Sequence, residues 1–119
     1  MFNNNVFTFS VPAEPKYISI VRLTTSGIAN TMKFDVDGIE DLKMSVSEAC
    51  NIIISESNKD TINIEYILSE EEISIKIDGV NRYSIEENDS SKMSEMIIRA
   101  LMDEVKYNDN KIELIKKIG

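Results

Sequence analysis

Apolar residues alternate with polar ones along five short stretches of the chain, and they recur every three or four residues along three longer stretches. Alternation is typical of a strand with one buried face, and the longer period is typical of a helix with one buried stripe. The pattern therefore predicts the order strand, helix, helix, strand, strand, helix, strand, strand. The predicted strands cover residues 7–11, 61–68, 71–78, 104–107 and 111–118, and the predicted helices cover 16–33, 39–55 and 91–103.

Short polar segments join the second strand to the third and the fourth to the fifth, which predicts two hairpins in a mostly antiparallel sheet. The stretch DVDG, residues 35–38, predicts a turn between the first two helices. With all helices on one face of the sheet, the fold is an α/β (α+β) two-layer sandwich, formed as a single domain over residues 1–119. The other sheet face is then wet or paired with a second copy. The expected inward positions are Tyr17, Val21, Thr24, Ile28, Met32, Ile39, Leu42, Val46, Ala49, Ile53, Ile62, Ile64, Tyr66, Leu68, Ile73, Ile75, Ile77, Met93, Ile97, Ala100 and Leu101.

The balance of charged residues excludes some classes of function. Thirteen Lys and Arg against 21 Asp and Glu give a formal net charge of −8, whereas sequence-independent nucleic-acid binding requires clustered Lys and Arg. The absence of histidine excludes His-based zinc sites and Ser-His-Asp triads. We therefore expect a protein partner with a basic surface, or simply high solubility, and no nucleic-acid partner.

The single cysteine, Cys50, cannot form an internal disulfide, which favours a reducing, cytoplasmic location. It lies in the middle of the predicted second helix, and we expect a buried structural thiol because no histidine is present to activate it. No apolar segment approaches the roughly 18 residues that a membrane span requires. The first residues, MFNNN, have no basic cluster and no apolar run typical of a signal peptide. We expect no membrane association.

Three stretches carry a family resemblance: VPAEPKYISIVRLTTSGIAN (11–30), IEDLKMSVSEAC (39–50) and ALMDEV (100–105). In this order and spacing they resemble the anti-sigma factor serine kinases of the RsbW and SpoIIAB type, which have the histidine-kinase-like ATPase fold. The resemblance covers nearly the whole chain. The resemblance implies the same two-layer fold. It also implies a regulatory protein whose nucleotide binding and catalysis depend on three short sequence motifs, called boxes here.

The first box of the family is E-A-x-x-N on the second helix, where the Glu is a general base and the Asn holds magnesium. Glu48 and Ala49 match, but Ile52 stands at the Asn position and Asn51 comes one residue early. One residue along a helix is a rotation of about 100°, and an alkyl group cannot bind a hard cation. Ile52 and Met44 suit a filled pocket, so the resemblance implies that Glu48 is a vestigial general base and that no metal is bound.

The second box is D-x-G-x-G, where the Asp accepts a hydrogen bond from the adenine amino group. Aligning Gly79 with the first glycine puts Ile77 at the Asp position and Asn81 at the second glycine. Asp78 is one residue away, and a slip of one residue sends a strand side chain to the opposite face. We interpret DGVN as a turn that leaves the strand.

The third box is a G-x-G at the mouth of the last helix, where backbone amides receive phosphates. Lys92 and Ser94 stand at the glycine positions, so side chains fill the space of the phosphates, although Lys92 itself is a candidate phosphate contact. The segment that separates the second box from the third predicted helix is only NRYSIEENDS, residues 81–90. Members of the family usually have a longer lid there.

Three altered boxes favour the loss of nucleotide binding. We expect a non-catalytic partner-switching protein, a degenerate serine/threonine protein kinase without a cofactor. The remaining nucleotide-binding candidates are Asn51, Asp78, Gly79 and Lys92, and a rescued site would require Asn51 and Asp78 to face one shared cavity. The alternatives are an active, divergent serine/threonine kinase that uses ATP and Mg²⁺, and an unrelated regulatory or structural α/β domain with only the fold in common.

Arg22 matches an arginine in the family's first helix that contributes to contacts with partners, which are a sigma factor and an antagonist of the STAS type. It follows the inward Val21, so we expect it at or near solvent, where arginine is a frequent interface anchor. The alternative is a solvated charge or an ion pair with a nearby acid. The resemblance also implies a homodimer, and the first strand, VFTFSV, is expected near a sheet edge or on the uncovered face.

Overall fold

The computed structural model describes residues 5–56 and 58–119, which form a helical layer packed on one sheet. The helices are α1 (Ile18–Asn30), α2 (Val36–Glu56), α3 (Arg82–Glu86) and α4 (Asp89–Leu101), and a 3-10 turn, η1 (Pro15–Tyr17), precedes α1. The strands are β1 (Asn5–Pro12), β2 (Thr61–Leu68), β3 (Glu72–Asp78), β4 (Glu104–Asn108) and β5 (Lys111–Lys117).

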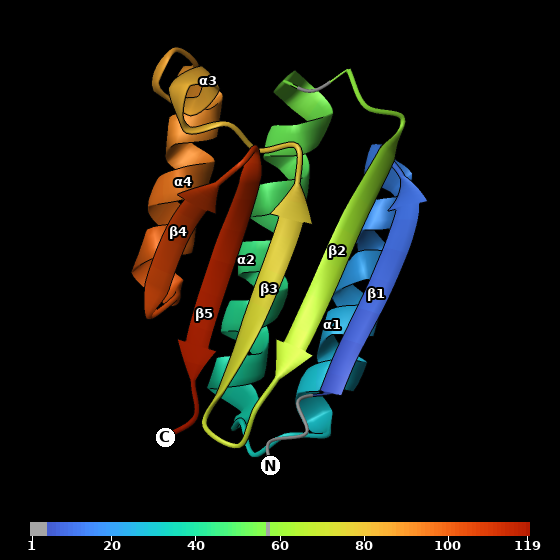
Figure 1. Ribbon diagram of the computed structural model, residues 1–119, viewed down its shortest axis with the longest axis vertical. Coiled ribbons are helices and arrows are strands. Elements are labelled where there is room, and N and C mark those ends of the chain that lie inside the picture. The colour runs from blue at the N-terminus through green and yellow to red at the C-terminus, as the bar shows by residue number, and fades with distance from the viewer. Residues whose placement is uncertain (1–4, 57) are drawn as a thin grey trace.

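The five-stranded sheet has the order β1-β2-β3-β5-β4, and every neighbouring pair is antiparallel (Figure 1). Strands β2 and β3 form one hairpin, and β4 and β5 form the other. In the second hairpin, Asp109 and Asn110 have φ angles of 47° and 64°, which Asp and Asn tolerate better than most residues. Both predicted hairpins are confirmed, and β1 lies at an edge of the sheet.

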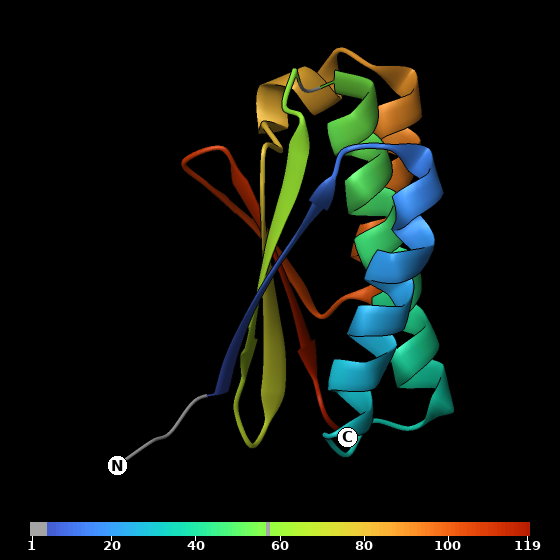
Figure 2. The ribbon, with the colours of Figure 1, turned by 90° about the vertical axis from the view of Figure 1, so that its right-hand side faces the viewer.

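All helices cover the same face of the sheet, as Figure 2 shows in profile. The alternation along β2, β3 and β5 turns every second side chain towards the helices, because successive side chains of a strand point to opposite faces. Apart from the partly buried Lys116 near the end of β5, those inward side chains are buried: Ile62, Ile64, Tyr66, Leu68, Ile73, Ile75, Ile77, Ile112 and Leu114. The predicted two-layer sandwich is therefore confirmed.

Helix α2 lies between α1 and α4 and packs against both (Figure 1). The predicted stripes on α1 and α2 are buried as expected at Val21, Ile28, Leu42, Val46, Ala49 and Ile53. The predictions for Tyr17, Met32, Ile39 and Leu101 hold less completely, because these side chains are partly buried against the same core.

The predicted buried face of α4 is wrong: the helix is rotated about its axis by roughly the angle between two successive residues. Ile98, not Ile97, is fully buried, Ile97 is half-buried, and Met93 and Ala100 are exposed. Polar anchors set this rotation: Ser94 bonds to Glu48 of α2, and the Tyr107 hydroxyl of β4 donates to Glu95. These bonds turn the two methionines of α4 outwards.

Three smaller differences concern element boundaries. Helix α2 begins at Val36, inside the predicted DVDG turn, and the Asp35 carboxylate accepts a hydrogen bond of 2.8 Å from the amide of Gly38. On α1, Thr25 faces the core in place of Thr24 and bonds to the Tyr66 hydroxyl at 2.7 Å. Helix α3 was not predicted.

The sheet face without helices carries both polar and apolar rows, and one row of cross-strand neighbours consists of Val6, Ile67, Ser74 and Ile115. Another row of cross-strand neighbours across β1, β2, β3, β5 and β4 reads Thr8, Glu65, Lys76, Glu113 and Lys106, so charges of opposite sign alternate. Such neighbours favour each other and remain hydrated. Among the described residues, no helix combines the length and apolar character of a membrane span.

Candidate functional site

The candidate site lies where α2 meets α4, at Glu48. The Ser94 hydroxyl donates a hydrogen bond of 2.8 Å to Oε1 of Glu48, and Ser94 is buried. Glu48 is half-buried. The carboxylate that the sequence identified as a vestigial general base therefore has a hydrogen-bond partner in the helical layer. In the family pattern, Glu48 stands at the position of the general base and Ser94 at a glycine position of the third box. The bond therefore links two positions of the nucleotide site.

Ile52 and Asn51 lie on different sides of α2. The Ile52 side chain is 1% exposed and belongs to the core, whereas Asn51 is exposed. The separation follows from the rotation of about 100° between successive helical residues. An amide at position 51 therefore faces solvent, and an alkyl group occupies the position of the metal ligand.

Ile77 and Asp78 lie on opposite faces of β3. Ile77 is fully buried under the helices, and Asp78 makes an ion pair of 3.6 Å with Lys111 on the uncovered face. Gly79 then leaves the strand with φ 97°, and its amide donates to the Asn110 carbonyl at 2.7 Å. The interpretation of DGVN as a turn agrees with this geometry, in which a positive φ favours glycine.

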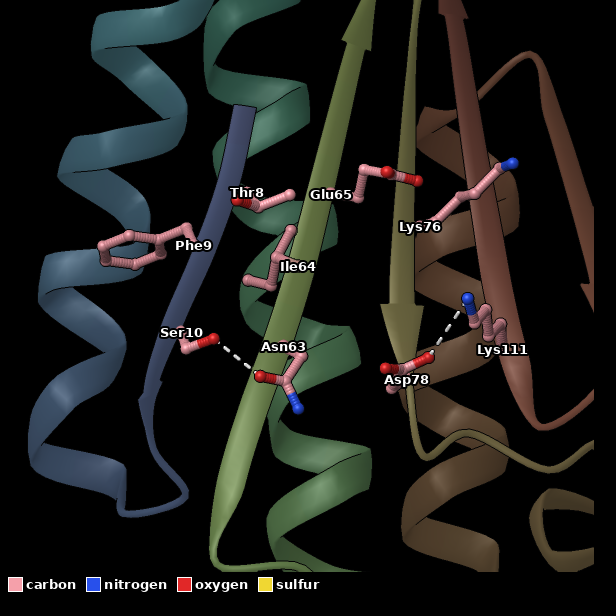
Figure 3. A pocket seen from close by; sticks show the side chains of 9 residues that line it. All are labelled: Thr8, Phe9, Ser10, Asn63, Ile64, Glu65, Lys76, Asp78 and Lys111. Carbon is pink, nitrogen blue, oxygen red and sulfur yellow. Dashed lines mark hydrogen bonds and ion pairs between the residues drawn. The ribbon is translucent and has the colours of Figure 1, made fainter. Parts of the chain in front are cut away.

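Asp78 lines a shallow groove of about 290 Å³ on the uncovered sheet face (Figure 3). In Figure 3, Asp78 and Lys111 point towards each other, as do Ser10 and Asn63, whose side chains are hydrogen-bonded at 2.6 Å. Asn51 does not line this groove. The structure thus places Asn51 on the helical layer and Asp78 beyond the sheet, and it does not bring them into one cavity.

Lys92 and Ser94 lie inside α4, not at its mouth as the sequence suggested. The helix begins at Asp89, where the Asn88 side chain accepts a hydrogen bond from the Ser91 amide at 3.1 Å. The Lys92 amide donates to the Asn88 carbonyl at 2.9 Å, so it is already used within the helix. The Lys92 ammonium lies 4.0 Å from the Asp89 carboxylate at the surface.

Arg22 on α1 is half-buried, and its guanidinium donates a hydrogen bond of 2.8 Å to the Ser47 hydroxyl of α2. Ser47 in turn donates to the Lys43 carbonyl at 2.8 Å. The ion pair with an acid, one of the alternatives considered for this arginine, is absent among the described residues, and the partner is a serine. Leu23, the next residue, is exposed, whereas Ile20 lies on the opposite flank of the helix, on the other side of the buried Val21.

Cys50 is buried, as expected, and burial raises the pKa of its thiol to about 12. Desolvation disfavours the thiolate, which is the reactive form. Burial likewise raises the pKa of Tyr66 to about 12, and the hydrogen bond between Tyr66 and Thr25 opposes this shift. Neither group is suited to nucleophilic chemistry at neutral pH.

The contact between Ser94 and Glu48 was not predicted, although both residues were singled out. Its partners are 46 residues apart, and no local pattern indicates which face of α4 meets α2.

Curated proteins named serine-protein kinase RsbW are similar to this chain. The protein from Oceanobacillus iheyensis is 35% identical over 130 residues, which cover 92% of this chain and 82% of the relative. The chain belongs to the RsbW family. The protein from Bacillus velezensis is 31% identical over 84% of this chain and 76% of the relative. The protein from Bacillus subtilis is 44% identical over a shorter stretch, 53% of this chain and 39% of the relative. No protein-family model matches the sequence.

Family membership agrees with the fold, an antiparallel sheet with its helices on one side, as in histidine-kinase-like ATPases. The stretch aligned with the Oceanobacillus RsbW, 130 residues, is longer than the whole chain of 119 residues. That RsbW therefore has residues within the aligned stretch that this chain lacks. The short segment 81–90 is one place where such residues were expected.

Proposed function

We propose that this RsbW-family protein is a partner-switching regulator that binds a sigma factor or a STAS-type antagonist and has lost nucleotide binding. The hydrogen bond between Ser94 and Glu48 is the observation that carries the proposal. A general base must be free to accept a proton from its substrate. Here a buried hydroxyl of α4 already donates to that carboxylate, and α4 itself occupies the space next to it.

The residues do not fit Mg-ATP. Magnesium requires oxygen ligands in octahedral geometry, and the buried alkyl group of Ile52 offers none. The adenine amino group would meet the buried Ile77 in place of a carboxylate, and an unpaired polar group in a pocket costs about 1–3 kcal/mol. Phosphates at α4 would meet the side chains of Lys92 and Ser94 and amides that already have partners. We derive no catalytic step through the nucleotide.

The surface of α1 supports the binding part of the proposal. Arg22 is held by Ser47 but remains partly accessible, and Ile20 and Leu23 are 43% and 73% exposed. An arginine whose fork is oriented by one hydrogen bond and that remains partly accessible is typical of an interface anchor. We propose that this face of α1 contacts the sigma factor or the antagonist.

An active, divergent kinase is the second candidate, and the names of the curated relatives favour it. Calorimetric titration with Mg-ATP at millimolar concentration separates the two candidates, and thermal unfolding with and without the nucleotide gives a second readout. A ligand that binds only the folded state must raise the apparent stability as its concentration rises. We expect no saturable heat and no shift. Saturable heat that disappears in Asn51→Ala would support the kinase.

A binding experiment tests the partner. We expect a purified sigma factor or STAS-domain protein from the same genome to bind the chain without nucleotide. If both bind only after Mg-ATP is added, the partner-switching role stands and the loss of nucleotide binding is wrong. If neither binds under any condition, the chain is a regulatory or structural domain of another kind.

A further inference from the structure

The connection between β3 and α4 contains α3 and crosses from the sheet to the helical layer at one end of the molecule (Figures 1 and 2). We call residues 79–88 the strap. The Tyr83 amide donates to the Asn81 side chain at 2.8 Å, and the Ile85 amide donates to the Asn81 carbonyl at 3.2 Å. Towards the end of the strap, the Asn88 amide donates to the Ile85 carbonyl at 3.2 Å. Family members usually have a longer lid at this place, whereas here the strap is folded by its own hydrogen bonds.

The turn between β4 and β5 holds the start of the strap. The Asn110 carbonyl accepts hydrogen bonds from the Gly79 amide at 2.7 Å and from the Val80 amide at 3.1 Å. The side-chain oxygen of Asn110 accepts a third bond, of 3.1 Å, from the side-chain nitrogen of Asn81. A single residue, 29 positions beyond Asn81 in the chain, therefore latches the strap.

The middle of the strap contributes to the core. Val80 and Ile85 are each 1% exposed, whereas Tyr83, on the same short helix as Ile85, is 76% exposed. Val80 and Ile85 belong to the same core cluster as Ile52 and Ile77. In the family pattern, Ile52 stands at the magnesium position and Ile77 at the adenine position. The strap therefore adds buried apolar side chains to the cluster that includes both nucleotide positions.

We propose that the strap is an autoinhibitory plug, in which Asn110 is the latch and Ile85 covers the residues at the nucleotide positions. The latch also acts on α4, because the strap runs directly into this helix and the Asn88 side chain accepts a hydrogen bond of 3.1 Å from the Ser91 amide. A lid that closes on a ligand takes its order from that ligand, whereas this strap takes its order from the chain itself. The plug rests on the proposed function in one respect, the assignment of the nucleotide positions from the family pattern.

Amide hydrogen exchange, measured by NMR on the unchanged chain, tests whether the strap is closed. We expect the amides of Val80 and Ile85 to exchange more slowly than in an unstructured chain by about a hundredfold or more. The Val80 amide reports on the latch, because it donates to Asn110, and the Ile85 amide reports on the plug. Rapid exchange at both amides would show an open lid and would overturn the inference.

Variants of Asn110 test the latch. Asn110→Gly keeps the left-handed turn and the carbonyl but loses the side-chain bond to Asn81, so exchange of the Ile85 amide should accelerate about three- to tenfold. Asn110→Asp keeps the acceptor oxygen and should retain slow exchange. Asp109→Gly is the matched change at the neighbouring turn position, with φ 47°, and should leave the strap unaffected. An equal acceleration in both glycine variants would assign the effect to the turn alone and contradict the latch.

Variants of Ile85 test the plug. Ile85→Ala removes most of a fully buried side chain, so amide exchange in the strap should accelerate by at least about thirtyfold. The methyl NMR signals of Ile52 and Ile77 should shift in this variant, although neither residue is changed. Tyr83→Ala, an exposed change on the same short helix, should have neither effect. Ile85→Val, with an expected acceleration of about two- to tenfold, provides the same test if the alanine variant does not fold.

Methyl signals of Ile52 and Ile77 that stay in place in both Ile85 variants would show that the strap does not cover the nucleotide positions, and this result would overturn the plug. None of these measurements uses Mg-ATP or a protein partner. The proposed function is read from calorimetric titration of the unchanged chain and from partner binding. A failure of the plug is therefore distinguishable from a failure of the proposed function.

Discussion

Replacing Ile52 by Asn restores the family's E-A-x-x-N pattern and tests whether a nucleotide site is close to recovery. Ile52 is 1% exposed, so the change removes a fully buried aliphatic side chain, at about 1.5–3 kcal/mol. It also places an amide in the core between α2 and the sheet, which adds about 1–3 kcal/mol if the amide has no partner. We therefore expect Ile52→Asn to lower the free energy of unfolding by about 3–5 kcal/mol.

Urea unfolding followed by circular dichroism measures this change. With a slope of about 1–3 kcal/mol/M for a small domain, the midpoint should fall by roughly 2 M. Asn51→Ala is the matched control one residue earlier. Because Asn51 is exposed and outside the core, its change should stay within about 0.5 kcal/mol.

Mg-ATP gives the second readout of the same variant. The core still has Ile77 at the adenine position, and Ser94 still bonds to Glu48, so millimolar Mg-ATP should not raise the midpoint of Ile52→Asn. Two results would refute the reasoning. A loss of stability below about 1 kcal/mol would mean that position 52 faces a polar space. A midpoint that rises with Mg-ATP would mean that a single residue separates the chain from nucleotide binding.

Three further predictions concern the buried thiol, the partner face and self-association. Because burial raises the pKa of Cys50 to about 12 and that of Tyr66 to about 12, the folded state holds these protons more tightly than the unfolded state. The free energy of unfolding should therefore be unaffected by these groups below about pH 9 and should fall as the pH rises towards 12. Each group lowers it by up to about 1.4 kcal/mol per pH unit, and the Cys50→Ala variant should show a smaller slope. Arg22→Ala should weaken binding of the sigma factor or antagonist by about 2 kcal/mol. The lost bond to Ser47 should lower the free energy of unfolding by about 1 kcal/mol or less. An unchanged affinity would show that Arg22 is not part of the interface. The edge strand β1, with Phe7 43% exposed, should support a homodimer, and light scattering that shows a monomer at tens of micromolar would contradict this.

The sequence by itself determined the sheet and its connections. Alternation of period two admits only one inward face for each strand, so the burial of Ile64, Ile75 and Ile77 follows once a core exists on one side. Short polar links between strands leave only hairpins as connections. The same local reasoning separated Ile52 from Asn51 and Ile77 from Asp78, because each pair consists of neighbours on a helix or a strand whose directions are fixed by its geometry.

Tertiary structure decided the rotation of α4 and, with it, the state of the candidate site. The sequence of α4 has apolar residues on two sides, Met93, Ile97 and Ala100 on one and Ile98 on the other, so its period does not select the buried side. Hydrogen bonds to residues distant in the chain made the selection, from Ser94 to Glu48 and from Tyr107 to Glu95. Half-buried carboxylates must keep hydrogen-bond partners, and only the folded arrangement of α2, α4 and β4 supplies them. The physical reason is that burial of apolar area has no direction, whereas hydrogen bonds between elements do.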